Sequence, residues 1–415
     1  MTAEANRTEF FETAVKLGFY GLDKGGLFGK HDYVRKFWED TVTKRVILPP
    51  LERLWRRRGR LRVVDLGCGS GEGLELISHI PYPANQEPPR SGFLLWRDDL
   101  EEYVGVDISP SMIAQGRENY GGLDNVRFIE HDLSQGFPLM AGPPYDLYFS
   151  SYSSMSHLSL QQLQSLLKQI FTHIQDEAYV LLDLLGRLSS EWPSYWDRTC
   201  RETLPYNMAY LVPSDRRSVE SFDSYQVAFW SADEIVEVAR DAAAAAARAL
   251  EIACRDRSIL VGRHMETGMF NGAPLQLRQQ VNRLFHRGYR GEPEKLRCDL
   301  SFLTPFKEIQ PLAYERILRY VEQWNTVVSL MTALMGSHDA EVRNIIETAS
   351  GTLADDLKML AWLHRSADRF PVADFWASIM GPQIACVLRN LEFTLPGGLG
   401  CGHGLLCLIK VNKPG

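Results

Sequence analysis

The chain of 415 residues contains no uninterrupted apolar run of the ~18 residues that a membrane span needs. Its first seven residues are polar, and no apolar segment of the kind found in signal peptides follows them. The sequence therefore predicts a cytoplasmic protein without a membrane partner.

Cysteine is scarce, with seven scattered residues, and an odd number favours reduced thiols over a disulfide framework. Cys401, His403 and Cys407 lie close together, but no second Cys/His pair stands nearby. We therefore expect a glycine-rich turn before a core strand at this point, and no metal site.

An excess of basic residues is also missing. Lys and Arg number 45 against 52 Asp and Glu, for a formal net charge of -7. This balance argues against a nucleic-acid partner, which usually meets a basic face. The one basic run, residues 56–62, is interpreted as a solvated helix end, with contact to an anionic partner as the alternative.

From residue 62 onward, short apolar runs alternate with helical stretches such as 160–174. This alternation predicts an α/β fold, a mostly parallel sheet with helices on both faces. The expected strands are residues 63–66, 103–107, 126–129, 146–149 and 179–183, then a sixth over 250–262, interrupted at 255–257, and a last strand over 404–411.

Helices are expected on either side of this region. Residues 8 to about 58 show helical spacing, and Pro49-Pro50 should break the second of two helices there. Ser231 should cap another helix. The clearest helix, Leu312–Met335, lies in a long helical insertion. The expected units are residues 1–58 (N-terminal helices), 59–264 (cofactor domain), 265–389 (helical insertion, as a cap or a dimer interface) and 390–415 (C-terminal strand).

The strongest motif is residues 65–73, Asp-Leu-Gly-Cys-Gly-Ser-Gly-Glu-Gly, after an apolar strand. Glycines in a strand-to-helix turn let the backbone approach a ligand closely, and the helix start offers free N–H groups. A dinucleotide site would need G-x-G-x-x-G, but Glu72 takes the third glycine position. Asp65 suits a cationic or polar ligand and would repel a pyrophosphate.

In these residues the sequence resembles the class I S-adenosylmethionine-dependent methyltransferases, whose first motif is an acid followed by G-x-G-x-G. The resemblance covers about residues 60 to 190 and the last strand. It implies a Rossmann-like fold with an antiparallel last strand, S-adenosylmethionine as cofactor and S-adenosylhomocysteine as product. It also implies that Asp107 binds the ribose hydroxyls and that Asp132 lies near the adenine amino group.

The same resemblance suggests the remaining cofactor contacts. With Asp65, Asp107 and Asp132 they are Gly67, Cys68, Gly69, Gly71, Ile108, Met112, His131, Leu133 and Ser150. The three acids have simpler readings: Asp65 could orient the loop, Asp107 could cap a strand end, and Asp132 could form an Asx turn. Asp107 lies further from the glycines than ~20 residues because a proline-rich loop at 81–90 intervenes.

Methyl transfer needs alignment of the acceptor, exclusion of water and, for some acceptors, a base. The acceptor should lie beyond the fourth and fifth strands. There, His157 is the candidate base and Tyr152 a candidate hydrogen-bond donor, although both could be packing residues. Further aromatic residues could line the pocket or cover it as a lid, or serve as core: Trp192, Tyr195, Trp196 and His264 for the pocket, and Tyr20, Tyr33 and Trp38 for the lid.

We expect a methyltransferase that acts on an oxygen or nitrogen of a small molecule. The insertion could also form the interface of a homodimer. A protein or RNA methyltransferase and a non-methylating cofactor-binding protein are the alternatives.

Overall fold

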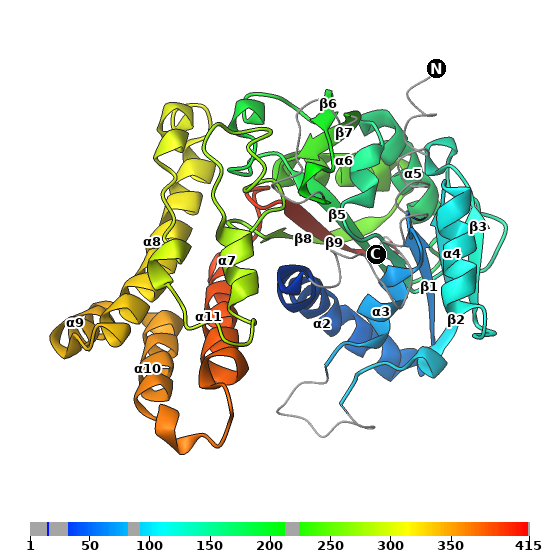
Figure 1. The fold of residues 1–415 in the computed structure, drawn as a ribbon. Helices are drawn as coiled ribbons and strands as arrows, with labels where there is room; N and C mark the ends of the chain where they lie inside the picture. The colour runs from blue at the N-terminus through cyan, green and yellow to red at the C-terminus, as the bar shows by residue number, and fades with distance from the viewer. Residues whose placement is uncertain (1–14, 16–31, 82–91, 212–223, 414–415) are drawn as a thin grey trace.

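A computed structural model describes residues 15, 32–81, 92–211 and 224–413 (Figure 1). Within them, one nine-stranded sheet follows the path β3-β2-β1-β4-β5-β7-β6, and β9 pairs with both β5 and β8. The strands are β1 Leu61–Leu66, β2 Leu100–Asp107, β3 Val126–Glu130, β4 Leu147–Phe149, β5 Ala178–Gly186, β6 Thr203–Tyr206, β7 Tyr225–Trp230, β8 Ala249–Arg257 and β9 Gly404–Asn412.

The predicted α/β fold is confirmed. Strands β1 to β5 pair in parallel, and β9 runs antiparallel between β5 and β8. The sixth strand was wrongly placed: β8 continues without a break to Arg257, and residues 258–262 lie outside it. Its charged end is tolerated because β9 pairs along its whole length and because Asp256 accepts backbone hydrogen bonds from Gly400 and Cys401.

The β6–β7 pair was not expected from the sequence. One edge of β5 is occupied by β9 over residues 178–185. The other edge carries β4 beside residues 179–181 and then β7 beside Leu185 and Gly186. The hairpin of β6 and β7 therefore fills the position beyond the end of β4, at the carboxyl edge of the sheet.

Prolines do not break the N-terminal helix, contrary to the sequence prediction. A π-helix, η2 (Val34–Asp40), continues directly into α2 (Thr41–Arg58), which contains Pro49 and Pro50. Each proline removes a backbone donor, but the buried side chains of Ile47, Leu51 and Leu54 hold the helix against the core.

Helices cover both faces of the sheet. Those packed around the sheet are α3 Glu72–Ser78, α4 Pro110–Tyr120, α5 Leu160–His173 and α6 Ala232–Ala245, the last capped by Ser231 as predicted. Side chains of α2, α3 and α4 share a core with Val63, and those of α5 and α6 share a second core with Val64. Because neighbouring strand residues point to opposite faces, these two cores lie on the two sides of the sheet.

The insertion is helical, as predicted, and stands beside α2 (Figure 1). Its helices are α7 Leu277–Arg283, α8 Pro311–Met335, α9 Asp339–Thr348, α10 Gly351–Arg365 and α11 Gly381–Thr394, so α11 crosses the boundary expected at residue 389. Trp324 of α8 is fully buried, and its ring centroid lies 6.0 Å from that of Trp38. The apolar stripe of α8 is thus covered within the chain in part by the N-terminal helix. No helix in the described part of the chain is long and apolar enough to cross a membrane.

Candidate functional site

The glycine loop after β1 combines two tight positions with one open position. Gly67, Gly69 and Gly71 have φ angles of +71°, +53° and +90°, which side-chain-bearing residues rarely adopt. A Cβ on Gly71 would lie 2.8 Å from the Phe128 ring, whereas a Cβ on Gly69 would meet only Met112 Sδ, at 4.0 Å. The backbone of Gly69 therefore faces free space.

Asp107 closes this loop from the end of β2. Its Oδ2 accepts a hydrogen bond from Gly69 N at 2.8 Å, and its Oδ1 accepts one from Ser109 N at 2.9 Å. Each carboxylate oxygen keeps a further lone-pair site. Burial raises the pKa of Asp107, and the backbone hydrogen bonds oppose that rise. The neighbouring Ile108 is 42% exposed, so a large apolar surface lies next to an anchored carboxylate.

Asp65 lies beneath the loop and is fully buried. Its Oδ2 accepts a hydrogen bond from the Tyr103 hydroxyl, and its Oδ1 has no partner among the described residues. Burial raises its pKa to about 7, against the opposing effect of Tyr103. A Cβ on Gly73 would lie 2.0 Å from Asp65 Oδ2, so only glycine fits there. These contacts indicate that Asp65 supports the glycine loop. Direct contact of Asp65 with a ligand stays a prediction.

The other predicted cofactor residues occupy mainly structural positions. Asp132 caps a 3-10 helix, Leu133–Gln135, with Ser134 N 2.8 Å from Oδ1 and Ser134 Oγ 2.7 Å from Oδ2, as the Asx-turn reading expected. The ring of His131 contacts Gly136 O at 3.2 Å. Ser150 is buried, and its Oγ accepts a hydrogen bond from Asp183 N at 3.1 Å. Cys68, Met112 and Leu133 are also buried.

Backbone strain marks the loop after β4. Tyr152 and Ser153, neither of them glycine, have φ angles of +53° and +64°, and such conformations cluster at functional sites. The Tyr152 hydroxyl donates to Asp40 Oδ1 at 2.8 Å, and burial raises its pKa well above the usual range. Its ring centroid lies 4.4 Å from the guanidinium carbon of Arg35 and 5.9 Å from that of Arg263.

His157 ends a short 3-10 helix, η5 (Ser154–His157), and lies against the β6–β7 hairpin. Its ring centroid is 5.3 Å from that of Tyr225, with the two rings nearly parallel. Ser156 of the same turn accepts a hydrogen bond from Leu185 N at 2.8 Å. The candidate base therefore lies beside the carboxyl end of β5, in contact with an element that was not predicted.

A cluster of aromatic side chains surrounds this end of the sheet. Its buried members, Trp192, Tyr206 and Phe229, pack with Tyr195, Leu204, Tyr210, Tyr225 and Phe270. His264 lies within the cluster, and burial lowers its pKa to about 3, so its ring is neutral at physiological pH. Trp192 and His264 thus belong to an aromatic core at the predicted acceptor position. Trp196 is also fully buried, in the neighbouring main core.

The buried carboxylate of Glu191 joins three segments beneath this cluster. It contacts His403 Nδ1 at 2.9 Å, and it accepts hydrogen bonds from Ser189 Oγ and the backbone N–H of His264. His403 is therefore paired with a carboxylate from the chain after β5. In the described residues, no group of three or more His, Cys, Asp or Glu side chains could hold a metal ion.

The predicted lid residues have different environments. Trp38 is fully buried in the core, and Tyr33 is 39% exposed and stacks on Phe285 with 4.9 Å between ring centroids. Packing therefore accounts for both. Tyr20 lies outside the described residues.

A network of buried ion pairs was missed by sequence reasoning. Glu39 of η2 is fully buried and receives Arg263 at 2.7 Å and Arg278 at 2.8 Å. Burial favours a higher pKa for Glu39, but the two guanidiniums hold it well below its usual range. Nearby, Arg257 forms a two-point ion pair with Asp183 at 2.9 and 3.1 Å. No local motif marks these residues, because their partners are far apart in the chain.

Comparison with known proteins gives a family match for part of the sheet. A family model described as "Methyltransferase domain" matches residues 92–177. No curated protein matches the sequence.

Among solved structures, the chain is similar to an S-adenosylmethionine-dependent methyltransferase from Clostridium acetobutylicum, at 14% identity and a TM-score of 0.34, covering 53% of this chain and 83% of that one. It is also similar to DesVI from Streptomyces venezuelae, at 14% identity and a TM-score of 0.33, with coverages of 53% and 89%. At this sequence identity and TM-score, the similarity gives no information about the methyl acceptor.

Proposed function

We propose that this chain, which matches the methyltransferase-domain model over residues 92–177, is a class I S-adenosylmethionine-dependent methyltransferase. It transfers the methyl group to an oxygen or nitrogen atom of a small-molecule acceptor, leaving S-adenosylhomocysteine. The observation that supports this proposal is that four segments of the chain meet at the predicted acceptor position. The N-terminal helix η2, the loop after β4, the β6–β7 hairpin and the segment after β8 all meet there.

The cofactor residues fit S-adenosylmethionine. Asp107 is anchored by two backbone N–H groups and retains lone pairs for the ribose hydroxyls. The open face of Gly69 lets the ligand approach the backbone, and Ile108 offers an exposed apolar surface for the adenine ring. The bound cofactor supplies an activated methyl group, so the protein's part is to bind, orient and exclude water.

On the acceptor side we propose an orienting role for Tyr152 and a base role for His157. The raised pKa of Tyr152 keeps its hydroxyl protonated, and that proton is donated to Asp40, so the oxygen is left to accept a hydrogen bond from an O–H or N–H group of the methyl acceptor. An imidazole titrates near neutrality and can take the proton that an O–H or N–H acceptor loses. Stacking on Tyr225 fixes the plane of the His157 ring.

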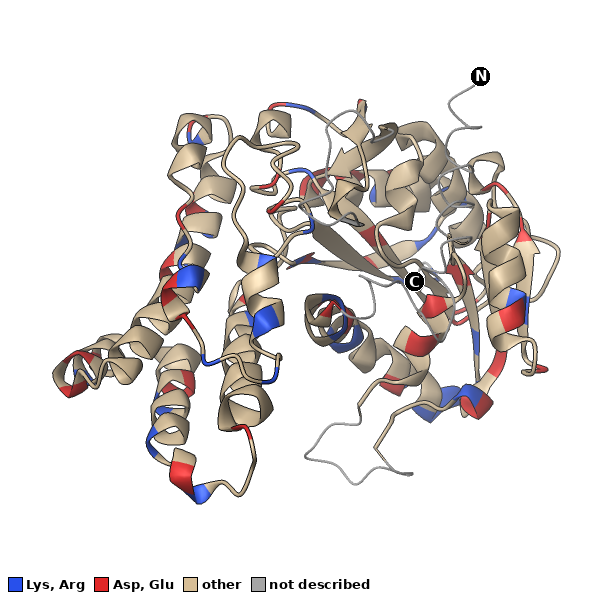
Figure 2. Cartoon of the chain, in the orientation of Figure 1, with Lys and Arg blue, Asp and Glu red and all other residues tan. Residues whose placement is uncertain are grey.

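The surface charge favours a small acceptor over RNA. Acidic and basic residues are interspersed on the described helices, as Figure 2 shows for α8, α9 and α10. A nucleic-acid substrate would require a concentrated basic face, and the chain as a whole is acidic.

The test measures S-adenosylhomocysteine formed from S-adenosylmethionine in two fractions of a cell extract. One contains only solutes that pass an ultrafiltration membrane, and the other contains the retained macromolecules. Product in the small-solute fraction, absent with Asp107→Ala, is expected. Product only with the retained fraction would instead identify a macromolecular acceptor, and product with neither would oppose a small-molecule acceptor.

A further inference from the structure

Arg35 occupies the junction between the two loops that follow β1 and β4. It lies on η2, and its Nη2 forms an ion pair with Glu72, the first residue of α3 after the glycine loop. Its guanidinium carbon lies 4.4 Å from the ring centroid of Tyr152, in the loop after β4. One cation therefore contacts both loops at the carboxyl edge of the sheet.

The hydrogen bonding of this guanidinium is incomplete. The Arg35 side chain is 14% exposed, and its Nε is buried without a hydrogen-bond partner in the described part of the chain. An unpaired buried donor is destabilising, and more so when it is charged. A guanidinium matches a carboxylate with two parallel N–H groups. Arg35 can thus donate hydrogen bonds to a second anionic group beside Glu72.

The sheet order indicates which end of the cofactor comes here. The strand order β3-β2-β1-β4 places Asp132 and Asp107 on one side of the glycine loop and Tyr152 on the other. If the adenosine lies toward Asp107 and Asp132, the opposite end of the molecule lies toward Arg35. That end of S-adenosylmethionine is an amino acid, and its carboxylate is the only anionic group of the cofactor.

We propose that Arg35 binds the methionine carboxylate of S-adenosylmethionine, with the Tyr152 ring as the platform that holds the guanidinium. The carboxylate accepts a hydrogen bond from the unpaired Nε–H group, and Glu72 keeps its contact with Nη2. The cofactor thereby joins the N-terminal helix η2 to the glycine loop. This role does not depend on the identity of the methyl acceptor. The Arg35 proposal can therefore be wrong while the proposed function is right, and the proposed function can be wrong while the Arg35 proposal is right.

The test compares two ligands that differ at this end. S-adenosylhomocysteine carries the amino-acid group, and 5′-methylthioadenosine lacks it. In calorimetric titrations, Arg35→Met is expected to weaken binding of S-adenosylhomocysteine by about 10- to 100-fold, the usual range for a charged hydrogen bond, and to change binding of 5′-methylthioadenosine by less than about twofold. Arg35→Lys, which keeps the charge without the fork, should lie between Arg35→Met and wild type.

Arg97→Met is the matched control, because Arg97 pairs with Glu75 on the same helix α3. It should leave both affinities unchanged. Equal weakening of both ligands by Arg35→Met would indicate a purely structural role and overturn the proposal, as would no change in either.

If Arg35→Met does not fold, wild-type protein decides the question. It should bind S-adenosylmethionine at least about tenfold more tightly than its decarboxylated form. Equal affinities would contradict a carboxylate contact.

Discussion

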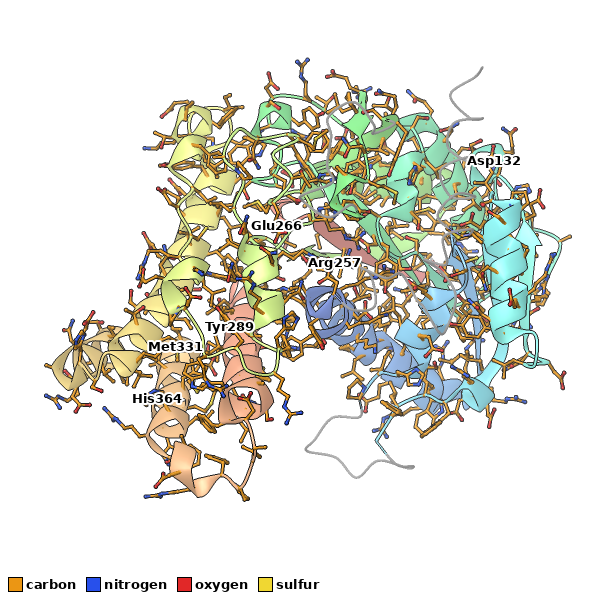
Figure 3. The ribbon with its side chains drawn as sticks, viewed as in Figure 1. Asp132, Arg257, Glu266, Tyr289, Met331 and His364 are labelled. Atoms are coloured by element: carbon orange, nitrogen blue, oxygen red, sulfur yellow. The ribbon has the colours of Figure 1, made fainter. Side chains whose placement is uncertain are left out.

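The carboxyl edge of the sheet has a cofactor half, formed by the ends of β1, β2 and β3, and an acceptor half, formed by the ends of β4 and β5 with η2 packed against them. The two halves pair their buried carboxyl groups in different ways. On the cofactor half, the acids are held without cations: Asp65 by a tyrosine hydroxyl, Asp107 by backbone N–H groups and Asp132 by Ser134. On the acceptor half, arginines pair with two of the buried acids, Glu39 and Asp183, and His403 pairs with a third, Glu191. In Figure 3, Asp132 lies on the β3 side of the molecule and Arg257 lies toward the insertion.

This difference indicates what each half is built to meet. Because no cation neutralises them, these carboxyl groups leave acceptor oxygens and, when ionised, negative charge for a ligand with hydroxyl, ammonium or sulfonium groups. A half whose charges are internally paired, and whose remaining surface is aromatic, offers little to a strongly ionic acceptor. The comparison therefore favours a neutral or aromatic acceptor next to a polar, positively charged cofactor.

The largest expected effect comes from breaking the ion pairs of the acceptor half. Glu39→Gln leaves Arg263 buried without its anion and leaves Arg278 with Asp32 alone, and removal of one partner from a buried pair costs about 3–5 kcal/mol. The free energy of unfolding in urea should fall by that amount. Asp355→Asn is the control, because Asp355 pairs with Lys358 at the exposed surface, where a change below about 0.5 kcal/mol is expected. If both variants lowered the free energy of unfolding equally, the buried ion pair would contribute no more to stability than the exposed one.

A pH-dependent effect is expected from Asp65 on the cofactor half. Its folded-state pKa of about 7 lies above the ordinary aspartate value of 3.8, so the folded protein holds this proton more tightly than the unfolded chain. Stability should therefore fall as the pH rises from about 4 to about 7, by at most about 4 kcal/mol from this group.

Asp65→Asn removes this ionisation. We expect the melting temperature of Asp65→Asn, relative to that of the wild type, to increase as the pH is raised from 5 to 8. Glu392, whose pKa burial also raises to about 7, contributes equally in both proteins and cancels in the difference. If the melting temperatures of the two proteins instead change in parallel over this pH range, the pKa of Asp65 is not raised.

A smaller effect should appear in cofactor binding. If Asp107 binds the ribose as proposed, Asp107→Ala removes hydrogen bonds worth ~2–3 kcal/mol, or roughly 30- to 150-fold in the dissociation constant of S-adenosylmethionine. Calorimetric titration measures it, with the melting curve as a check of folding. An unchanged affinity in the folded variant would exclude the ribose contact.

The smallest effect tests the boundary between the halves. Tyr152→Phe removes the hydrogen bond to Asp40 and keeps the ring beneath Arg35. The free energy of unfolding should fall by about 1 kcal/mol, while the dissociation constant of S-adenosylmethionine should stay within about twofold. A large loss of cofactor affinity would place the hydroxyl itself in the cofactor site.

The strand ends that carry the predicted cofactor residues could be predicted from sequence because the information for them is local. The glycine loop, Asp107 and Asp132 each follow directly on an apolar strand, and the parallel strands bring their ends to one edge. The strand positions followed from short hydrophobic runs in the same way.

The acceptor half could not be predicted in this manner. Glu39 and Arg278 are 239 residues apart, and neither stands in a motif. Pro49 and Pro50 signal a break by local rules, but burial of the surrounding helix outweighs them. The β6–β7 hairpin has short strands, and its place beside β5 depends on where β4 ends. Long-range packing decides each of these features.

The position of β9 has a consequence for how the molecule is made. Strands β5 and β8 are not bonded to each other, because β9 lies between them and pairs with both. On the ribosome, both strands are synthesised long before residues 404–412, and the entire insertion emerges in the interval. Until then each presents an unpaired edge of the kind that recruits other chains. Late completion of the sheet centre should make nascent chains dependent on chaperones and prone to aggregation when they stop short of β9.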